Sequence, residues 1–409
     1  MVSELEGGLT AVPGFRAAGV DAGIKREGPD LSLVACEKGA VPAAALFTSN
    51  NFKGAPVQVS EENMENRELG GVIANSGCAN AFTGSEGIRN ANKMAELAAD
   101  ILEIGTEDIG VASTGRIGEQ LPISKVEKGA EKLEENLSNS WEAGTEAAEA
   151  LMTTDSRPKE MAVKIEIEDE TEVTIGGAAK GAGMIHPDLH ATMLGIIVTD
   201  AKITPAGLES ALQKSADQSF NMITVDKDTS PNDTVFALAN GLADNERITK
   251  KDPSDAFQEG LDYVTRKLAI MIAKDGEGST HLVKVQVEGA NSEEEAEDAA
   301  RAVAGSNLVK ATIFGEDPNW GRIVTALGYS GAEFSPSRLS ISFLGEDSEV
   351  PLILRGDPVP EETIEEAEKI MREEEINIYV DLDEGDSSAT AWGCDLTDDY
   401  VKINSRYRL

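Results

Sequence analysis

Short apolar segments alternate with amphipathic ones along the chain. Runs rich in β-branched residues predict strands over residues 71–75, 195–199, 283–287 and 339–343. Apolar residues at helical spacing predict helices over residues 89–102, 124–137, 293–304 and 361–374. This mixture predicts an α/β fold in which sheets and helices form layers, with a second, smaller α/β lobe from about residue 285.

Negative charge dominates the composition. The chain has 36 Lys and Arg against 74 Asp and Glu, a formal net charge of −38. Such a surface repels phosphate backbones and anionic lipid headgroups, so we expect no nucleic-acid and no membrane partner. Two interpretations stay open: the acid only keeps the protein dissolved, or it fits a cytoplasm rich in salt, where counterions screen the repulsion.

The chain has the features of a cytoplasmic protein. Its N-terminus lacks a basic segment followed by an apolar core, and no apolar run approaches the roughly 20 residues of a membrane span. The cysteines, Cys36, Cys78 and Cys394, are far apart and form neither a CxxC pair nor a disulfide framework. We therefore expect a cytoplasmic location.

The segment over residues 176–200 has the most reactive pattern. It reads GGAAKGAGMIHPDLHATMLGIIVTD, in which small residues surround Lys180 and the pair Ala191-Thr192 leads into a predicted strand. A threonine hydroxyl can attack the preceding carbonyl in an N-to-O acyl shift, and hydrolysis of the ester leaves a free α-amine. Because such an amine titrates near neutral pH, it can act as base for its own hydroxyl. A threonine that begins a strand is usually only a strand former, so this pattern alone leaves both readings open.

Nine sequence blocks, in order along nearly the whole chain, change that balance. They read GFRAAGVDAGIK, ANSGCANAFTG, STGRIGEQLP, MTTDSRPK, KGAGMI…ATMLG, FNMITVDKDTSPNDTV, DGEGST, GEDPNWGR and DYVKIN. Through these blocks the chain resembles the ornithine acetyltransferase family, the glutamate N-acetyltransferases of arginine biosynthesis.

The resemblance implies a self-cleaving acyltransferase. Cleavage between Ala191 and Thr192 would give an α chain of residues 1–191 and a β chain of residues 192–409. Thr192 would then carry an acetyl group from N2-acetylornithine to glutamate in a ping-pong reaction, without a metal or organic cofactor. Acetyl-CoA as a further donor stays open. The family also implies a heterotetramer of two α and two β chains, and an α-β-β-α sandwich layered like that of N-terminal-nucleophile hydrolases.

The resemblance also assigns roles to single residues. Thr114 and Gly115 match the pair that forms the oxyanion hole. The substrate-binding positions match Thr153, Lys180, Thr192, Glu277 and Asn404. Ordinary alternatives stay open at four positions: a Ser-Thr-Gly turn around Thr114, a helix N-cap at Thr153 (which is compatible with substrate binding), and a solvated surface position for Lys180 and Glu277.

Two other readings of the chain are retained. The first keeps the threonine nucleophile but uses water as acceptor, which gives an amidohydrolase or aminopeptidase. The second is a non-catalytic, acidic assembly protein, which would stay uncut and form no acyl-enzyme.

We expect no metal site. Asp226, Asp228 and Asp233 are spread as in a calcium loop, but the required glycine and the closing glutamate are missing. His186 and His190 are four residues apart, but Pro187 interrupts a regular helix across them and no third ligand is evident. A polar loop near the reaction centre explains the three aspartates better.

Overall fold

Three β-sheets organise the protein. The computed structural model describes residues 2–168, 170–186, 193–345, 348–360 and 363–405. The first sheet has seven strands, in the order β1 (Val2–Leu5), β8 (Lys159–Glu166), β9 (Glu172–Lys180), β10 (Leu194–Thr199), β12 (Thr234–Ala239), β4 (Val41–Phe47) and β5 (Glu68–Leu69). The second has four, in the order β2 (Phe15–Val20), β3 (Leu31–Cys36), β6 (Gly71–Asn75) and β7 (Ile109–Ser113).

The first and second sheets pack face to face. In β10, Leu194, Ile196 and Val198 lie in the core between the sheets, whereas Ile197 lies in the core on the opposite face. This alternation follows from the two-residue period of a strand, and because both faces are covered the strand is buried throughout. Helix α4 (Trp141–Leu151) adds alanines and Leu151 to the core between the sheets.

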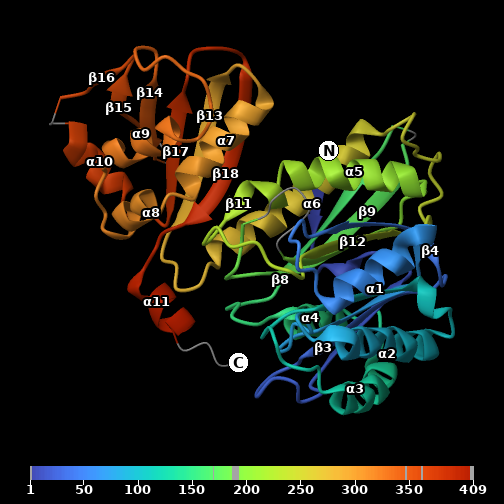
Figure 1. Ribbon diagram of the computed structural model, residues 1–409. Coiled ribbons are helices and arrows are strands. Elements are labelled where there is room, and N and C mark those ends of the chain that lie inside the picture. Colours follow the sequence, from blue (N-terminus) through green and yellow to red (C-terminus); the bar gives the residue numbers. More distant parts are fainter. Residues whose placement is uncertain (1, 169, 187–192, 346–347, 361–362, 406–409) are drawn as a thin grey trace.

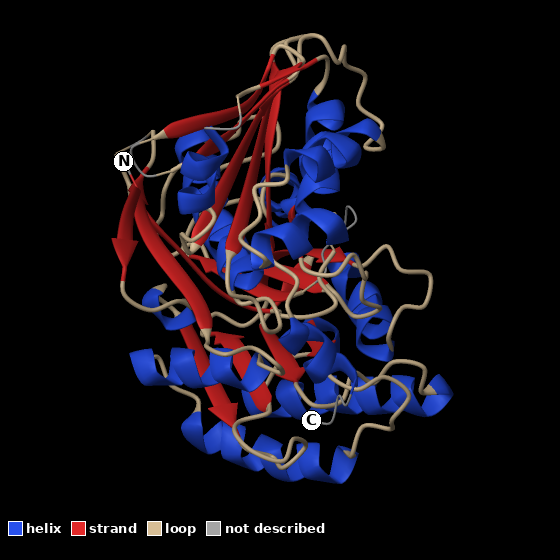
Figure 2. Ribbon diagram, turned by 90° about the vertical axis from the view of Figure 1, so that its left-hand side faces the viewer, coloured by secondary structure: helices blue, strands red, loops and turns tan. Residues whose placement is uncertain are grey.

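Helices cover the outer faces of this pair of sheets (Figure 1 and Figure 2). Helices α1 (Ala55–Asn63), α2 (Gly84–Leu102) and α3 (Ile123–Asn136) pack against the second sheet. Helices α5 (Pro205–Asp217) and α6 (Asp255–Lys274) pack against the first. The expected α-β-β-α layering is confirmed.

The third sheet forms a separate lobe, which is drawn in orange and red in Figure 1 except for one short edge strand in yellow-green. Its strand order is β11 (Ile223–Thr224), β18 (Ser387–Cys394), β13 (Leu282–Ala290), β17 (Glu375–Asp381), β14 (Ser340–Leu344), β15 (Glu349–Leu354) and β16 (Asp357–Pro358). The helices of this part of the chain are α7 (Glu293–Ala304), α8 (Asn307–Phe314), α9 (Trp320–Gly328) and α10 (Ile364–Ile370).

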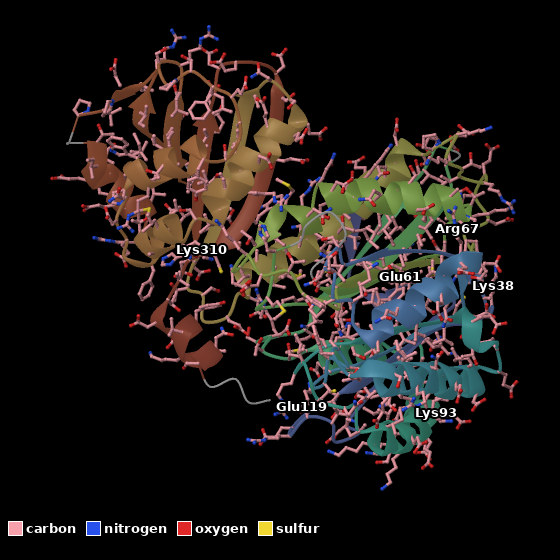
Figure 3. The ribbon with its side chains drawn as sticks, viewed as in Figure 1. Lys38, Glu61, Arg67, Lys93, Glu119 and Lys310 are labelled. Atoms are coloured by element: carbon pink, nitrogen blue, oxygen red, sulfur yellow. The ribbon has the colours of Figure 1, made fainter. Side chains whose placement is uncertain are left out.

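The last helix, α11 (Asp398–Ser405), reaches from this lobe towards the main body (Figure 1). Lys310 of α8 (labelled in Figure 3) is 1% exposed. Its Nζ donates a hydrogen bond of 2.6 Å to the carbonyl of Cys394, where β18 ends. The Thr397 hydroxyl donates to the carbonyl of Gly278 over 2.7 Å. These bonds fix the direction in which α11 leaves the sheet.

One predicted helix is too long. The pattern over residues 361–374 predicts a single helix, but α10 ends at Ile370, and residues 361–362 lie outside the described part of the chain. Glu375 pairs with Leu282 at the start of the β13/β17 ladder, so the chain must leave the helix before this point. Pairing in the sheet therefore overrides the helical pattern of the acidic segment.

Within the described ranges, no helix combines the length and the apolar character that crossing a membrane requires.

Candidate active site

A cavity of about 230 Å³ collects residues from segments that are far apart in the sequence. Six residues assigned from the sequence blocks line it: Thr114, Gly115, Thr153, Lys180, Glu277 and Asn404. Ala191 and Thr192 lie outside the described residues. Met193, which follows Thr192 directly, also lines the cavity.

Lys180 ends strand β9 inside the cavity. It pairs with Leu194 at the beginning of β10, so the ladder brings it beside the segment that follows Thr192. Its side chain is 7% exposed, and Nζ donates a hydrogen bond to the Thr114 hydroxyl over 3.1 Å. Burial lowers the pKa of Lys180, although the carboxylate of Asp155 acts in the opposite direction. The expected alternative of a solvated surface lysine is wrong.

Thr114 and Gly115 follow strand β7, and the chain bends at Gly115. The N–H of Thr114 donates to the carbonyl of Asn75 over 2.9 Å, so the hydroxyl is the donor of Thr114 that remains for a ligand. Gly115 has φ +131°, and a Cβ atom on it would lie 2.3 Å from the backbone carbon of Gly77. Among the described residues, the N–H of Gly115 has no hydrogen-bond acceptor. One hydroxyl and one backbone N–H are thus free to bind an oxyanion.

Glu277 and Asn404 come together from distant parts of the chain. The Glu277 carboxylate is buried, at 7% exposure, and accepts a 2.6 Å hydrogen bond from Nδ2 of Asn404 on α11. The N–H of Glu277 donates to the carbonyl of Ala182 over 2.9 Å, which joins it to the segment after β9. A Cβ atom on Gly183 would lie 2.4 Å from Cδ of Glu277, so glycine lets the backbone approach the carboxylate. The surface alternative for Glu277 is wrong as well.

Thr153 is bonded through its backbone N–H to a buried ionic cluster. The N–H groups of Thr153 and Gly181 donate to the Asp155 carboxylate over 3.0 and 2.7 Å. Nζ of Lys159 bonds both Asp155 and Asp275, each over 2.6 Å. No helix begins at Thr153, which follows α4 and precedes β8, so the N-cap alternative is wrong. The cluster therefore joins three segments that border the cavity: residues 153–159, Gly181 just after β9, and Asp275 just after α6.

The charges of this cluster control the protonation of Asp155. Burial on its own raises the pKa of Asp155, but Lys180 and Lys159 outweigh it and lower the pKa to about 2. Asp155 is therefore a carboxylate at neutral pH, and it compensates two buried ammonium groups.

Two further residues line the cavity: Asn232, to which the sequence assigned no role, and Asp233, which the sequence placed only in a polar loop near the reaction centre. Asn232 donates from Nδ2 to the carbonyls of Ser113 and Ala79 over 2.7 and 2.5 Å, which ties its loop to the segment of Thr114. Asp233 is 4% exposed, and burial raises its pKa well above the usual value despite the charge of Lys180. The block SPNDTV contains both residues, but nothing in their spacing indicated that the side chains turn inward.

No group of three or more His, Cys, Asp or Glu side chains that could hold a metal ion is present in the described ranges.

Comparison with known proteins gives the family. The profile described as the ArgJ family matches residues 16–409. The chain belongs to the ArgJ family. The resemblance to ornithine acetyltransferases that the nine blocks indicated is therefore confirmed.

Several relatives are similar to the chain over nearly their whole length. The chain is 51% identical over 407 residues to the arginine biosynthesis bifunctional protein ArgJ of Symbiobacterium thermophilum, a match covering 99% of both chains. It is 45% identical over 406 residues to the glutamate N-acetyltransferase of Methanothermobacter thermautotrophicus, covering 98% of both chains. A chain of the ornithine acetyltransferase of Mycobacterium tuberculosis, solved with ornithine, is 40% identical with a TM-score of 0.43, covering 46% of this chain and 99% of that chain.

Proposed function

We propose that the cavity is the active site of a self-cleaving glutamate N-acetyltransferase, with Thr192 as nucleophile, N2-acetylornithine as donor and glutamate as acceptor. The relatives named glutamate N-acetyltransferase and bifunctional ArgJ are 43–51% identical over nearly the whole chain, which supports this activity. One observation supports the site most directly. Six residues from distant sequence blocks line a single cavity at the beginning of the strand that follows Thr192.

Cleavage before Thr192 creates the reactive group. It leaves residues 1–191 and 192–409 as two chains, and gives Thr192 a free α-amine that removes the proton of its own hydroxyl. The hydroxyl oxygen attacks the acetyl carbonyl of the donor. The hydroxyl of Thr114 and the N–H of Gly115 bind the resulting oxyanion, a contribution of roughly 3 kcal/mol per donor. When the oxyanion collapses, the C–N bond of N2-acetylornithine breaks, the protonated α-amine of Thr192 gives its proton to the leaving nitrogen, and ornithine departs. The amino group of glutamate then attacks the threonine ester and takes the acetyl group, which restores the Thr192 hydroxyl.

Charged groups at two places of the cavity orient the substrates. The ammonium of Lys180 binds the α-carboxylate that donor and acceptor share. The carboxylate of Glu277, oriented by Asn404, binds the amino end of the donor. The Thr153 hydroxyl, which also lines the cavity, adds a further contact to the substrate. Lys180, Thr114 and Thr153 belong to residues 1–191, whereas Glu277 and Asn404 belong to residues 192–409, so the site needs both chains.

Intact-mass analysis of the purified protein beside Thr192→Ala tests the proposal. We expect two chains that meet after Ala191 for the wild type, and one uncut, inactive chain for T192A. Thr325→Ala is the matched control, because Thr325 is an exposed threonine on α9 in the other lobe. It should be cut and active. A wild-type protein that transfers acetyl groups with the 191–192 bond intact would refute the mechanism.

The acceptor is tested in the same preparation. Incubation with N2-acetylornithine should yield N-acetylglutamate only when glutamate is present, and free acetate without glutamate would favour the hydrolase alternative. Replacing the donor with acetyl-CoA decides whether the chain is bifunctional. Assembly of two α and two β chains stays a prediction, which the mass of the native complex checks.

A further inference from the structure

The donor and the acceptor of the proposed reaction differ in the charge of their side chains. N2-acetylornithine carries a δ-ammonium, which suits the carboxylate of Glu277, whereas glutamate carries a γ-carboxylate. Glu277 is buried, and its carboxylate accepts from Nδ2 of Asn404 over 2.6 Å. A second carboxylate beside it is repelled unless a cation lies close by. The acceptor therefore needs a positively charged group that the mechanism above does not provide.

Lys180 cannot serve both carboxylates of glutamate. Among the described residues that line the cavity, it is the one lysine or arginine. In the proposed mechanism its ammonium binds the α-carboxylate, which donor and acceptor share, and Nζ is held at the Thr114 hydroxyl by a hydrogen bond of 3.1 Å. The cation for the γ-carboxylate must therefore come from outside this lining.

A second cavity, of about 390 Å³, supplies such a cation. Thr154 and Glu277 line both cavities, so the second cavity lies directly beside the wall that Glu277 forms. Arg157 lines the second cavity. It belongs to the same sequence block as Thr153, but it has no part in the mechanism above.

The other charges of the second cavity leave Arg157 available. Asp275, which also lines it, is bonded to Nζ of Lys159 over 2.6 Å. Lys274 lines it too and faces the carboxylate of Glu374 over 3.5 Å. Arg157 is exposed and makes no ion pair with any residue in the described part of the chain. Its guanidinium is therefore the cation of this cavity that lacks a partner of opposite charge among these residues.

We propose, on the basis of the function proposed above, that the second cavity is the subsite for the side-chain carboxylate of the acceptor, and that Arg157 is the residue that selects glutamate. A guanidinium presents its N–H donors in a fork that matches the two oxygens of a carboxylate. The α-carboxylate stays at Lys180, while the γ-carboxylate turns past Glu277 towards Arg157. The δ-ammonium of the donor stops at Glu277, so the two substrates share one end of the site and diverge at the other.

The variant Arg157→Met tests the subsite, because it removes the charge and keeps most of the length of the side chain. In a ping-pong reaction, kcat/KM for each substrate reports its own half-reaction. We expect R157M to lower kcat/KM for glutamate about 10- to 30-fold and to leave kcat/KM for N2-acetylornithine unchanged. The preference for glutamate over glutamine, whose side chain is uncharged, should fall by a similar factor. Arg157→Lys keeps the charge but not the fork, so it should lose less.

Lys402→Met is the matched control. Lys402 is a cation on α11, two residues before Asn404, but it lines neither cavity and pairs with Asp399 over 2.8 Å. K402M should keep the wild-type kcat/KM for both substrates.

Two results overturn the assignment: an R157M protein with the wild-type kcat/KM for glutamate, or one that loses the same factor with donor and acceptor, which would show a general disturbance of the site. If R157M does not fold, Arg157→Gln is measured in the same way. A wild-type protein that transfers no acetyl group to glutamate contradicts the proposed function, whereas the ratio of the two half-reactions in R157M concerns the subsite alone, so the two failures are distinguishable.

Discussion

The side-chain hydroxyl and the backbone N–H of Thr114 have different hydrogen-bond partners. Lys180 donates to it over 3.1 Å, which leaves its own proton free to point into the cavity. The backbone N–H of the same residue is already bonded to Asn75. A side-chain hydroxyl paired with the N–H of Gly115 is therefore the donor set that this turn offers to a carbonyl oxygen.

Thr114→Val isolates this hydroxyl, because valine has nearly the same shape. We expect kcat for acetyl transfer to fall about 10²- to 10³-fold, since one of two donors to the oxyanion is lost. Steady-state kinetics of the cut enzyme measure the effect, and Thr114→Ser should restore much of the rate. An unchanged kcat in T114V would remove Thr114 from the oxyanion hole.

The segment from Thr153 to strand β8 holds the charged residues that fix the site in place. Asp155 and Lys159 lie on this segment, and Asp275 follows the end of α6, so one ionic cluster joins the segment to the region of Glu277. A buried pair adds little net stability over an apolar replacement, but removing one partner leaves an uncompensated charge.

Asp155→Asn should therefore lower the free energy of unfolding at neutral pH by about 3 kcal/mol or more. The folded-state pKa of about 2 lies below the unfolded value, so the contribution is complete above about pH 4 and is lost as the pH falls towards 2. Urea unfolding of both proteins between pH 7 and pH 3 should show the difference shrinking at the acidic end.

The control for that measurement is Asp244→Asn, which breaks an exposed pair with Lys202 and should leave the unfolding free energy nearly unchanged. A D155N deficit that stays constant down to pH 3 would contradict the assigned pKa.

The pattern of apolar residues predicted the bounds of an element well where a single sequence period, that of a strand or of a helix, governs it. Strand β6 and helix α7 match the predicted residues 71–75 and 293–304, because a buried strand and a well-capped amphipathic helix have simple periods. The pattern missed β8 and β9, whose glycines and charged residues are uncharacteristic of strands. Lys159 is the clearest omission, since a lysine at the start of a strand does not reveal that it is fully buried between two aspartates.

The site residues came from the family resemblance rather than from local pattern. Glu277 is one of 74 acidic residues, and only its sequence block distinguished it. Asp233 lies in such a block too, yet its place in the cavity lining depends on the parallel register of β10 and β12, which links residues 40 positions apart. Long-range pairing of this kind is not encoded in any short window of the chain.

The net charge of −38 affects the protein as a unit. Self-repulsion destabilises the compact state, and at physiological ionic strength screening acts only beyond about 8 Å. We expect the temperature of thermal unfolding to rise by a few degrees as KCl is increased from low concentration.

Calorimetry in KCl and in sorbitol of equal osmolality separates screening from solvent exclusion, because only the salt screens charge. Full stability and activity in the absence of added salt would remove the argument for a salt-rich cytoplasm.

The first sheet interleaves strands from both sides of the proposed cut. Strands β10 and β12 lie between β9 on one side and β4 on the other, and all their ladders connect residues 1–191 with residues 192–409 or with each other. Once the backbone is cut, unfolding releases two molecules instead of one, and regaining the native state becomes a second-order reaction. Dilution would then lower the apparent melting temperature, and heated enzyme would recover better in concentrated solution than in dilute solution.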